Sequence, residues 1–162
     1  MYNIGEKILY PPHGAGIIED IEERVVLGKK QKYYIMKMPS EEMTVMIPTE
    51  SCDEIGVRYI IDEAEARKVL EAFRSEQVSL DDNWNRRQRD NIAKIKTGDI
   101  YEVLSVVKAL MIRERTKGLS MSERKMLNVS RRIMTSEIVL SGAASMNDVE
   151  SILNDTITEL LK

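Results

Sequence analysis

The sequence predicts an α+β protein in which a small antiparallel β-sheet or barrel, residues 1–62, precedes an all-α region of about five helices, residues 63–162. Two observations support this division. The first 60 or so residues contain short apolar and β-branched runs separated by turn-forming residues, which is typical of hairpins. From Asp62 onward, apolar residues recur with helical spacing, and helix start and stop signals alternate along the chain. We therefore expect two small domains.

Five short runs in the first region have strand chemistry, and they cover residues 7–10, 16–21, 25–27, 33–38 and 43–48. Turn-forming segments rich in Pro, Gly and charged residues separate most of them, so consecutive strands should pair antiparallel. Gly14-Ala15-Gly16 begins like a dinucleotide-binding fingerprint, but the third glycine and the following helix are missing, and a turn is the better interpretation. An open sheet of this size leaves an edge strand that is either protected or used to pair with another chain.

Capping residues and glycines mark the predicted helices. Three pairs have the spacing of a capping box, namely Asp62 with Glu65, Ser120 with Glu123 and Ser145 with Asp148. Gly98, Gly118 and Gly142 follow the second, third and fourth helical patterns as stop signals. These signals predict helices over residues 62–75, 84–97, 100–117, 120–142 and 145–162. Apolar stripes on the later helices are typical of bundle packing.

Composition argues against an enzyme. Cys52 and His13 are the single cysteine and the single histidine, which excludes a disulfide framework and disfavours a zinc centre or a catalytic triad. We therefore expect no catalytic residues, no cofactor and no metal. No run approaches the roughly 18 to 20 apolar residues of a membrane span, and the first residues do not resemble a signal peptide. These observations predict a cytoplasmic protein without membrane contact.

The net charge of −3 conceals one basic block. Residues 83–132 contain 13 Lys and Arg against five Asp and Glu, a net charge of +8, whereas every other part of the chain is acidic. A basic block of this kind favours contact with a polyanion, because counterion release depends on local charge density. The alternative is a solvated helical face, and the sequence alone does not decide between them.

Trp84, the single tryptophan, lies at the start of a predicted helix inside this basic block. A lone tryptophan is commonly a core anchor. Here the residues below it on the same helix face, Gln88, Ile92 and Ile95, form a mixed stripe, which makes exposure plausible. An exposed apolar ring flanked by arginines can enter a minor groove or stack on an unpaired base while cations hold phosphates.

Several motifs spread along the chain make the sequence recognisable. They lie at residues 4–11, continuing into His13-Gly14, and at residues 43–48, 55–58, 83–87 and 118–127. With these motifs the sequence resembles the CarD/CdnL family of bacterial RNA polymerase-binding transcription regulators over essentially its whole length. The N-terminal region is also similar to the polymerase-interacting domain of the transcription-repair coupling factor, without the helicase motor of that protein.

The resemblance implies a Tudor-like N-terminal domain that docks on the β-subunit lobe of RNA polymerase, and a helical domain that contacts promoter DNA at the upstream edge of the melted bubble. The implied DNA-binding residues are Trp84 as the wedge with Arg86, Arg87, Arg89 and Lys125. The implied polymerase-binding residues are Arg24, Met43, Thr44, Val45, Met46, Ile47 and Pro48. Some family members have a basic residue where Met46 stands, so the contribution of Met46 to polymerase binding stays open.

The resulting hypothesis is a monomeric transcription regulator that bridges polymerase and DNA and stabilises the open complex without strong sequence specificity. The alternative is a free-standing, non-specific nucleic-acid-binding module that acts without polymerase. An acid/base enzyme built on Asp81 and Asp82 has only their adjacency in its favour. The sequence leaves open which promoters respond, whether the net effect is activation or repression, and how the two domains are oriented.

Overall fold

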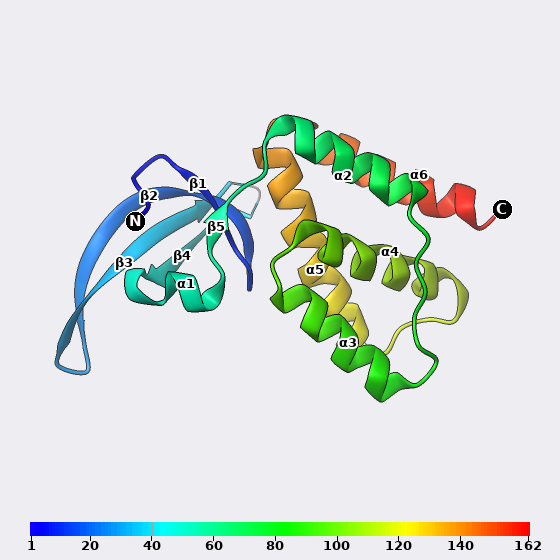
Figure 1. Ribbon diagram of the computed structural model, residues 1–162, viewed down its shortest axis with the longest axis horizontal. Helices are drawn as coiled ribbons and strands as arrows, with labels where there is room; N and C mark the ends of the chain where they lie inside the picture. Colours follow the sequence, from blue (N-terminus) through cyan, green and yellow to red (C-terminus); the bar gives the residue numbers. More distant parts are fainter. Residues whose placement is uncertain (40) are drawn as a thin grey trace.

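A computed structural model describes residues 1–39 and 41–162 and places a five-stranded sheet beside a group of helices (Figure 1). The elements of the sheet region are β1 (Lys7–Tyr10), β2 (Gly14–Val26), β3 (Lys29–Met38), β4 (Met43–Pro48), η1 (Thr49–Ser51), α1 (Cys52–Ile55) and β5 (Arg58–Tyr59). The elements that follow are α2 (Glu63–Ser75), α3 (Trp84–Lys96), α4 (Ile100–Thr116), α5 (Met121–Leu140) and α6 (Met146–Leu160). This architecture confirms the predicted fold class.

The sheet is antiparallel throughout, in the order β4-β3-β2-β1-β5. The expected strands at residues 16–21 and 25–27 are one continuous strand, β2, and the fifth strand is the unpredicted β5. Pairing of β2 with β3 runs to Val26 opposite Lys29, around a turn in which Leu27 and Gly28 both have positive φ. This hairpin extends away from the helices (Figure 1). The expected turn at residues 39–42 includes Ser40, which lies outside the described residues.

The helices begin where their capping residues predict. Asp62 Oδ1 accepts a hydrogen bond from the Glu65 N–H at 2.8 Å, and Ser120 with Glu123 forms a complete reciprocal capping box. Gly98, Gly118 and Gly142 follow α3, α4 and α5 with positive φ angles. The short helices η1 and α1 between β4 and β5 were not predicted. No helix in the described ranges is both long and apolar enough to cross a membrane.

Two apolar cores meet where the β1–β2 hairpin packs on α5. Leu9 and Ala15 of this hairpin belong to the core of the helical region, whereas a separate core contains Ile8, Ile18, Tyr34, Met36, Met38 and Ile47 of the sheet. Gly14 permits the close approach, because a Cβ at this position would lie 2.6 Å from Ser136 Oγ of α5. The adjacent Ala15 N–H donates to the same oxygen at 2.9 Å. The sheet and the helices are therefore packed against each other rather than loosely tethered.

An ion pair with a buried carboxylate reinforces this junction. Arg58 of β5 donates to both carboxylate oxygens of Glu137 of α5, at 2.6 and 2.9 Å, and also to the Gly98 carbonyl oxygen at 2.7 Å. The Ile61 N–H donates to Glu137 Oε2 at 2.9 Å. The Glu137 side chain is 1% exposed. This carboxylate thus connects the last strand, the chain segment leading to α2, and α5.

Candidate nucleic-acid interface

Trp84 is the first residue of α3, and Asn83 caps the helix by accepting a hydrogen bond from the Arg86 N–H at 3.0 Å. The indole is 44% exposed, which fits the expected wedge better than a core anchor. Its Nε1–H donates to Ser120 Oγ, the capping oxygen of α5, at 3.4 Å. The ring is therefore half-exposed and held at the point where the N-termini of α3 and α5 meet.

Arg87 differs from its sequence expectation. It is 3% exposed and donates to both oxygens of Glu123 at 2.8 and 3.2 Å, while its Nη1 donates to the carbonyl oxygens of Asp81 and Asp82. These partners occupy the guanidinium, so Arg87 does not present a free donor to a phosphate. Arg87 instead holds α3 against α5 and against the loop that precedes α3. It is therefore not part of the candidate contact surface.

Electrostatics stabilises both charges of this pair. The hydrogen bond from Arg87 holds the pKa of the Glu123 carboxyl below its usual value, against the opposing effect of burial. Conversely, the Glu123 carboxylate raises the pKa of the Arg87 guanidinium. Glu123 also accepts from the Ser120 hydroxyl at 3.1 Å. Ser120, the hydrogen-bond partner of Trp84, is therefore itself bonded to a buried carboxylate whose charged form is favoured by Arg87.

Arg86 and Arg89 are exposed on α3, on either side of the buried Arg87. Arg86 Nη1 lies 4.0 Å from an Asp81 carboxylate oxygen, and Arg89 makes no ion pair within residues 1–39 and 41–162. Arg89 shares a helix face with Ile92 and Lys96, three and seven residues later. Lys125 of α5 is also exposed and lines the same groove as Ile92 and Lys96. The structure therefore brings Lys125 to the side of α3 that carries Arg89.

Sequence reasoning missed the partners that position the indole. Ser120 and Glu123 had a recognisable capping-box spacing, but that spacing gives no sign of their contacts with Trp84 and Arg87. Met121, the first residue of α5, is 82% exposed immediately after Ser120. The sequence offered no signal for these contacts beyond the capping-box spacing itself.

The strand with the expected polymerase contacts, β4, forms an edge of the sheet. Thr44 and Met46 are exposed, whereas Ile47 is completely buried in the sheet core. The Ile47 side chain is therefore unable to touch a partner, and only its backbone lies at the edge. Arg24 lies on β2 near the hairpin tip, where its Nη2 donates to Glu22 at 2.8 Å.

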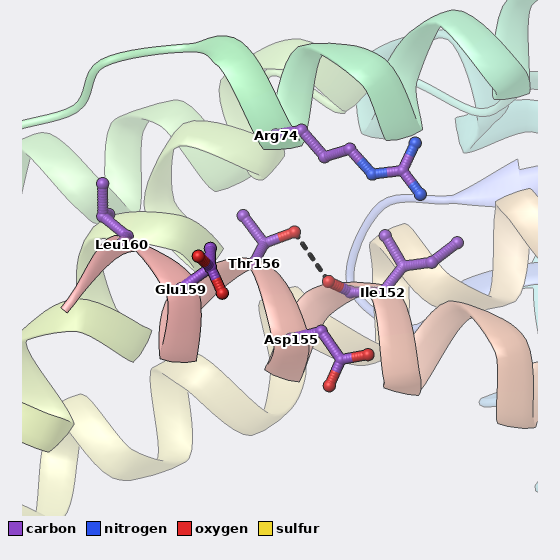
Figure 2. A pocket seen from close by; sticks show the side chains of 6 residues that line it. All are labelled: Arg74, Ile152, Asp155, Thr156, Glu159 and Leu160. Carbon is purple, nitrogen blue, oxygen red and sulfur yellow. Dashed lines mark hydrogen bonds between the residues drawn. The ribbon is translucent and has the colours of Figure 1, made fainter. Parts of the chain in front are cut away.

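A second groove, of about 500 Å³, lies between α2 and α6 and differs in charge from the basic face of α3 (Figure 2). Asp155 and Glu159 project from α6 along it, and Arg74 lies opposite them on α2, as Figure 2 shows. Arg74 is already paired with Glu71. The acidic side chains make this face unfavourable for phosphate, in contrast to the face of α3 that carries Arg86 and Arg89.

Comparisons with known proteins agree with the resemblance. A family model described as the CarD-like/TRCF RID domain matches residues 2–61, and one described as the CarD C-terminal domain matches residues 68–154. The chain is 37% identical over 151 residues to the "Putative transcription factor YdeB" of Bacillus subtilis (strain 168), covering 93% of this chain and 99% of that protein. A solution NMR structure of the 72-residue N-terminal domain of Myxococcus xanthus CarD is 27% identical, with a TM-score of 0.33, over 36% of this chain and 79% of that domain. The two family models and the YdeB match confirm the resemblance, and the chain belongs to the CarD-like family of transcription factors.

Proposed function

We propose that this transcription factor binds the β-subunit lobe of RNA polymerase through its sheet and contacts promoter DNA at the upstream edge of the melted bubble through the Trp84 surface, so that the open complex is stabilised. The observation that carries the proposal is the half-exposed Trp84 ring at the joined N-termini of α3 and α5. Membership of the CarD-like family supports the same function.

Trp84 has the properties of a wedge. An apolar ring that inserts into a minor groove or stacks on an unpaired base favours distorted DNA over intact duplex. The Arg87–Glu123 pair and the Ser120 contact fix the ring before binding, which lowers the entropy lost on insertion. Arg86 and Arg89 flank it as phosphate contacts that do not read sequence.

The edge of β4 is the proposed polymerase contact. Its outward-facing backbone groups between Met43 and Ile47 would pair with a strand of the β lobe by β-augmentation. The exposed side chains of Thr44 and Met46 would lie in that contact, with Met43, Val45 and Pro48 partly accessible beside them. Arg24 extends the contact along the neighbouring hairpin.

A bridge of this kind works with weak DNA affinity. Docking on polymerase raises the local concentration of the Trp84 surface at the promoter. Differential affinity for the open state then shifts the equilibrium, and a tenfold gain in open complex requires only about 1.4 kcal/mol. One inserted indole with its flanking cations is sufficient for that energy.

The lifetime of the open promoter complex, measured with purified polymerase, tests the proposal. Trp84→Ala should shorten the lifetime at saturating protein by about tenfold, and Trp84→Phe should lose less because an apolar ring remains. Leu160→Ala, which removes a similarly exposed apolar side chain from α6, is the matched control and should behave as wild type. Equal open-complex lifetimes for Trp84→Ala and wild type would show that Trp84 does not act as a wedge.

Two further measurements separate the alternatives. Thermal unfolding of Trp84→Ala should show a loss well below the roughly 3 to 5 kcal/mol of a core aromatic truncation. Co-purification of polymerase with the full chain should weaken in Met46→Glu, which places a charge on the exposed edge of β4. A chain that binds DNA but retains no polymerase would instead be a free-standing nucleic-acid-binding module.

A further inference from the structure

A groove of about 460 Å³ lies between the two halves of the molecule. Ile92 and Ile95 of α3 form one wall, Met126 and Val129 of α5 form another, and Pro11 of the β1–β2 turn contributes from the sheet region. Its volume falls within the range of small-molecule sites, about 300 to 1,000 Å³, and a position between packed units is common for them. The helices and the β1–β2 turn therefore border a groove of ligand size.

The groove is apolar and open to solvent. Ile92 is 39% exposed, although its neighbours Ile95 and Val129 are partly buried. Single exposed isoleucines are ordinary, but a concave set of apolar side chains from α3, α5, α1 and the β1–β2 turn is a binding feature. A ligand that fills it would remove apolar surface from water on several sides at once.

The charged residues that line the groove have one sign. Lys96 of α3 and Lys125 of α5 both line it, and neither makes an ion pair or a side-chain hydrogen bond with any residue of 1–39 or 41–162. Ser122 is the other polar residue of the lining. An apolar floor with two uncompensated ammonium groups complements a ligand that has an apolar body and a negative head.

We propose that this groove binds a small anionic amphiphile, such as a molecule with an aliphatic or aromatic body and one carboxylate, sulfonate or phosphate group. The apolar body would lie against Ile92, Ile95 and Val129, and the anionic group would lie between Lys96 and Lys125. A nucleic-acid backbone is a poorer fit, because its phosphates gain nothing from an apolar floor. The two lysines determine selectivity for an anion over a neutral molecule of the same length.

Binding would have a consequence for the rest of the protein. Ile55 of α1 and Pro11 belong to the sheet region, so a ligand in contact with them and with α3 would hold the two halves together. Lys125 is also a candidate phosphate contact, and this part of the inference rests on the proposed function. Occupancy of the groove would withdraw Lys125 from DNA and weaken DNA binding.

The experiment uses the full chain without DNA or polymerase and the fluorescent probe 1-anilinonaphthalene-8-sulfonate, an anionic amphiphile. We expect the fluorescence of the probe to increase on binding and to saturate at one probe molecule per chain. Dodecanoate and dodecyl phosphate should displace the probe at concentrations at least tenfold lower than dodecanol does. The double variant Lys96→Gln/Lys125→Gln should weaken probe binding at least tenfold, whereas Lys117→Gln, a similarly exposed lysine that does not line the groove, should not.

A second pair of variants tests the apolar wall. Ile92→Glu introduces a carboxylate into the groove and should abolish saturable binding, and Val26→Glu on the β2–β3 hairpin is the control with similar exposure. Equal affinity in wild type and the lysine double variant, displacement by dodecanol as strong as by dodecanoate, or non-saturable enhancement would each overturn the proposal. Since no DNA is present, its failure leaves the open-complex test of Trp84 unaffected.

Discussion

The two ends of α5 each contain a buried glutamate paired with an arginine, but the pairs connect different parts of the molecule. Near the N-terminus, Glu123 holds Arg87 of α3, thirty-six residues away in sequence. Near the C-terminus, Glu137 holds Arg58 of β5, seventy-nine residues away. The first pair fixes the Trp84 surface within the helical region, and the second fixes the sheet against that region.

The difference between the ends follows from helix electrostatics. Glu123 lies in the first turn of α5, where the helix dipole and the cap from Ser120 favour a negative charge. Glu137 lies in the last turn, where the dipole disfavours one, and it receives two hydrogen bonds from Arg58 and one from the Ile61 N–H. A 20-residue helix is about 30 Å long, so the two pairs near the ends of α5 are well separated along the helix.

The largest effect is expected at the N-terminal end. Arg87→Ala leaves the Glu123 carboxylate buried without its main partner, which should cost about 3 to 5 kcal/mol of unfolding free energy. Both side chains of this pair are 2% exposed, so water does not replace the lost contacts. Urea unfolding monitored by circular dichroism measures the loss.

Arg86→Ala is the matched control, because Arg86 is the adjacent residue on α3 but its side chain is 66% exposed. Its unfolding free energy should change by less than about 0.5 kcal/mol. Equal stability of the two variants would show that the Arg87–Glu123 pair does not fasten α3 to α5.

A smaller loss is expected at the C-terminal end. Arg58→Ala removes the hydrogen bonds to Glu137 and Gly98, but the Arg58 side chain is 31% exposed, so water can reach part of the vacated site. We expect a loss of about 1.5 to 3 kcal/mol. The fluorescence spectrum of Trp84 should stay unchanged in the folded state, because its partner Ser120 lies at the other end of α5.

Arg67→Ala, which breaks an exposed pair with Glu63 on α2, is the control and should cost less than about 1 kcal/mol. A shifted Trp84 emission spectrum in folded Arg58→Ala, with none in Arg67→Ala, would contradict the independence of the two ends.

These pairs also mark where sequence reasoning succeeds and where it stops. The five long helices were predictable because their start and stop signals are local, as with Ser120 and Glu123. The burial of Arg87 was not predictable, since it depends on a partner on another helix, and Arg86 beside it is exposed. Sequence reasoning correctly expected an exposed Trp84 but had no access to its contact with Ser120.

The sheet shows the same limit. The division of β2 into two expected strands reflected the polar run around Glu22, which interrupts an apolar pattern. The C-terminal half of β2 extends beyond the core as a two-stranded hairpin with β3. Its side chains therefore do not alternate between a buried and an exposed face, and the usual strand pattern is missing there. The two-residue strand β5 is too short to produce a pattern, and it forms through pairing with Ile8 and Leu9.

A weaker effect concerns DNA affinity rather than folding. Arg86→Glu/Arg89→Glu should lower affinity for all DNA sequences alike, since phosphate contacts position a protein without reading bases. The slope of log affinity against log salt should decrease in magnitude by about 1 to 2, roughly 0.9 for each lost phosphate contact. Lys68→Glu, an exposed charge reversal on α2, is the control. Identical slopes for the double variant and wild type would show that Arg86 and Arg89 do not contact phosphates.

The smallest effect is the pH dependence of the N-terminal pair. Arg87 lowers the pKa of Glu123 in the folded protein, and Arg113 Nε, 4.0 Å from the same carboxylate, adds positive charge nearby. A lowered folded-state pKa contributes stability above the unfolded-state value, about 4.3 for Glu, and this stability is lost as the pH falls through the folded-state pKa. Since one proton is involved, the slope from Glu123 cannot exceed about 1.4 kcal/mol per pH unit.

Glu123→Gln should therefore be less stable than wild type near pH 7, and the difference should narrow below about pH 4.3, because a protonated Glu123 resembles the glutamine. Burial also lowers the pKa of His13 in the folded protein. Protonation of His13 in the unfolded state therefore begins to reduce stability as the pH falls below its usual pKa of about 6.5, before Glu123 starts to titrate. His13 is present in both proteins and lies at the β1–β2 turn, outside the Glu123 pair, so its contribution cancels in the difference. Urea unfolding from pH 3 to pH 7 measures the two curves. A gap that stays constant across this range would mean that ionisation of Glu123 is not linked to folding, and that the N-terminal end of α5 is held by its cap and packing alone.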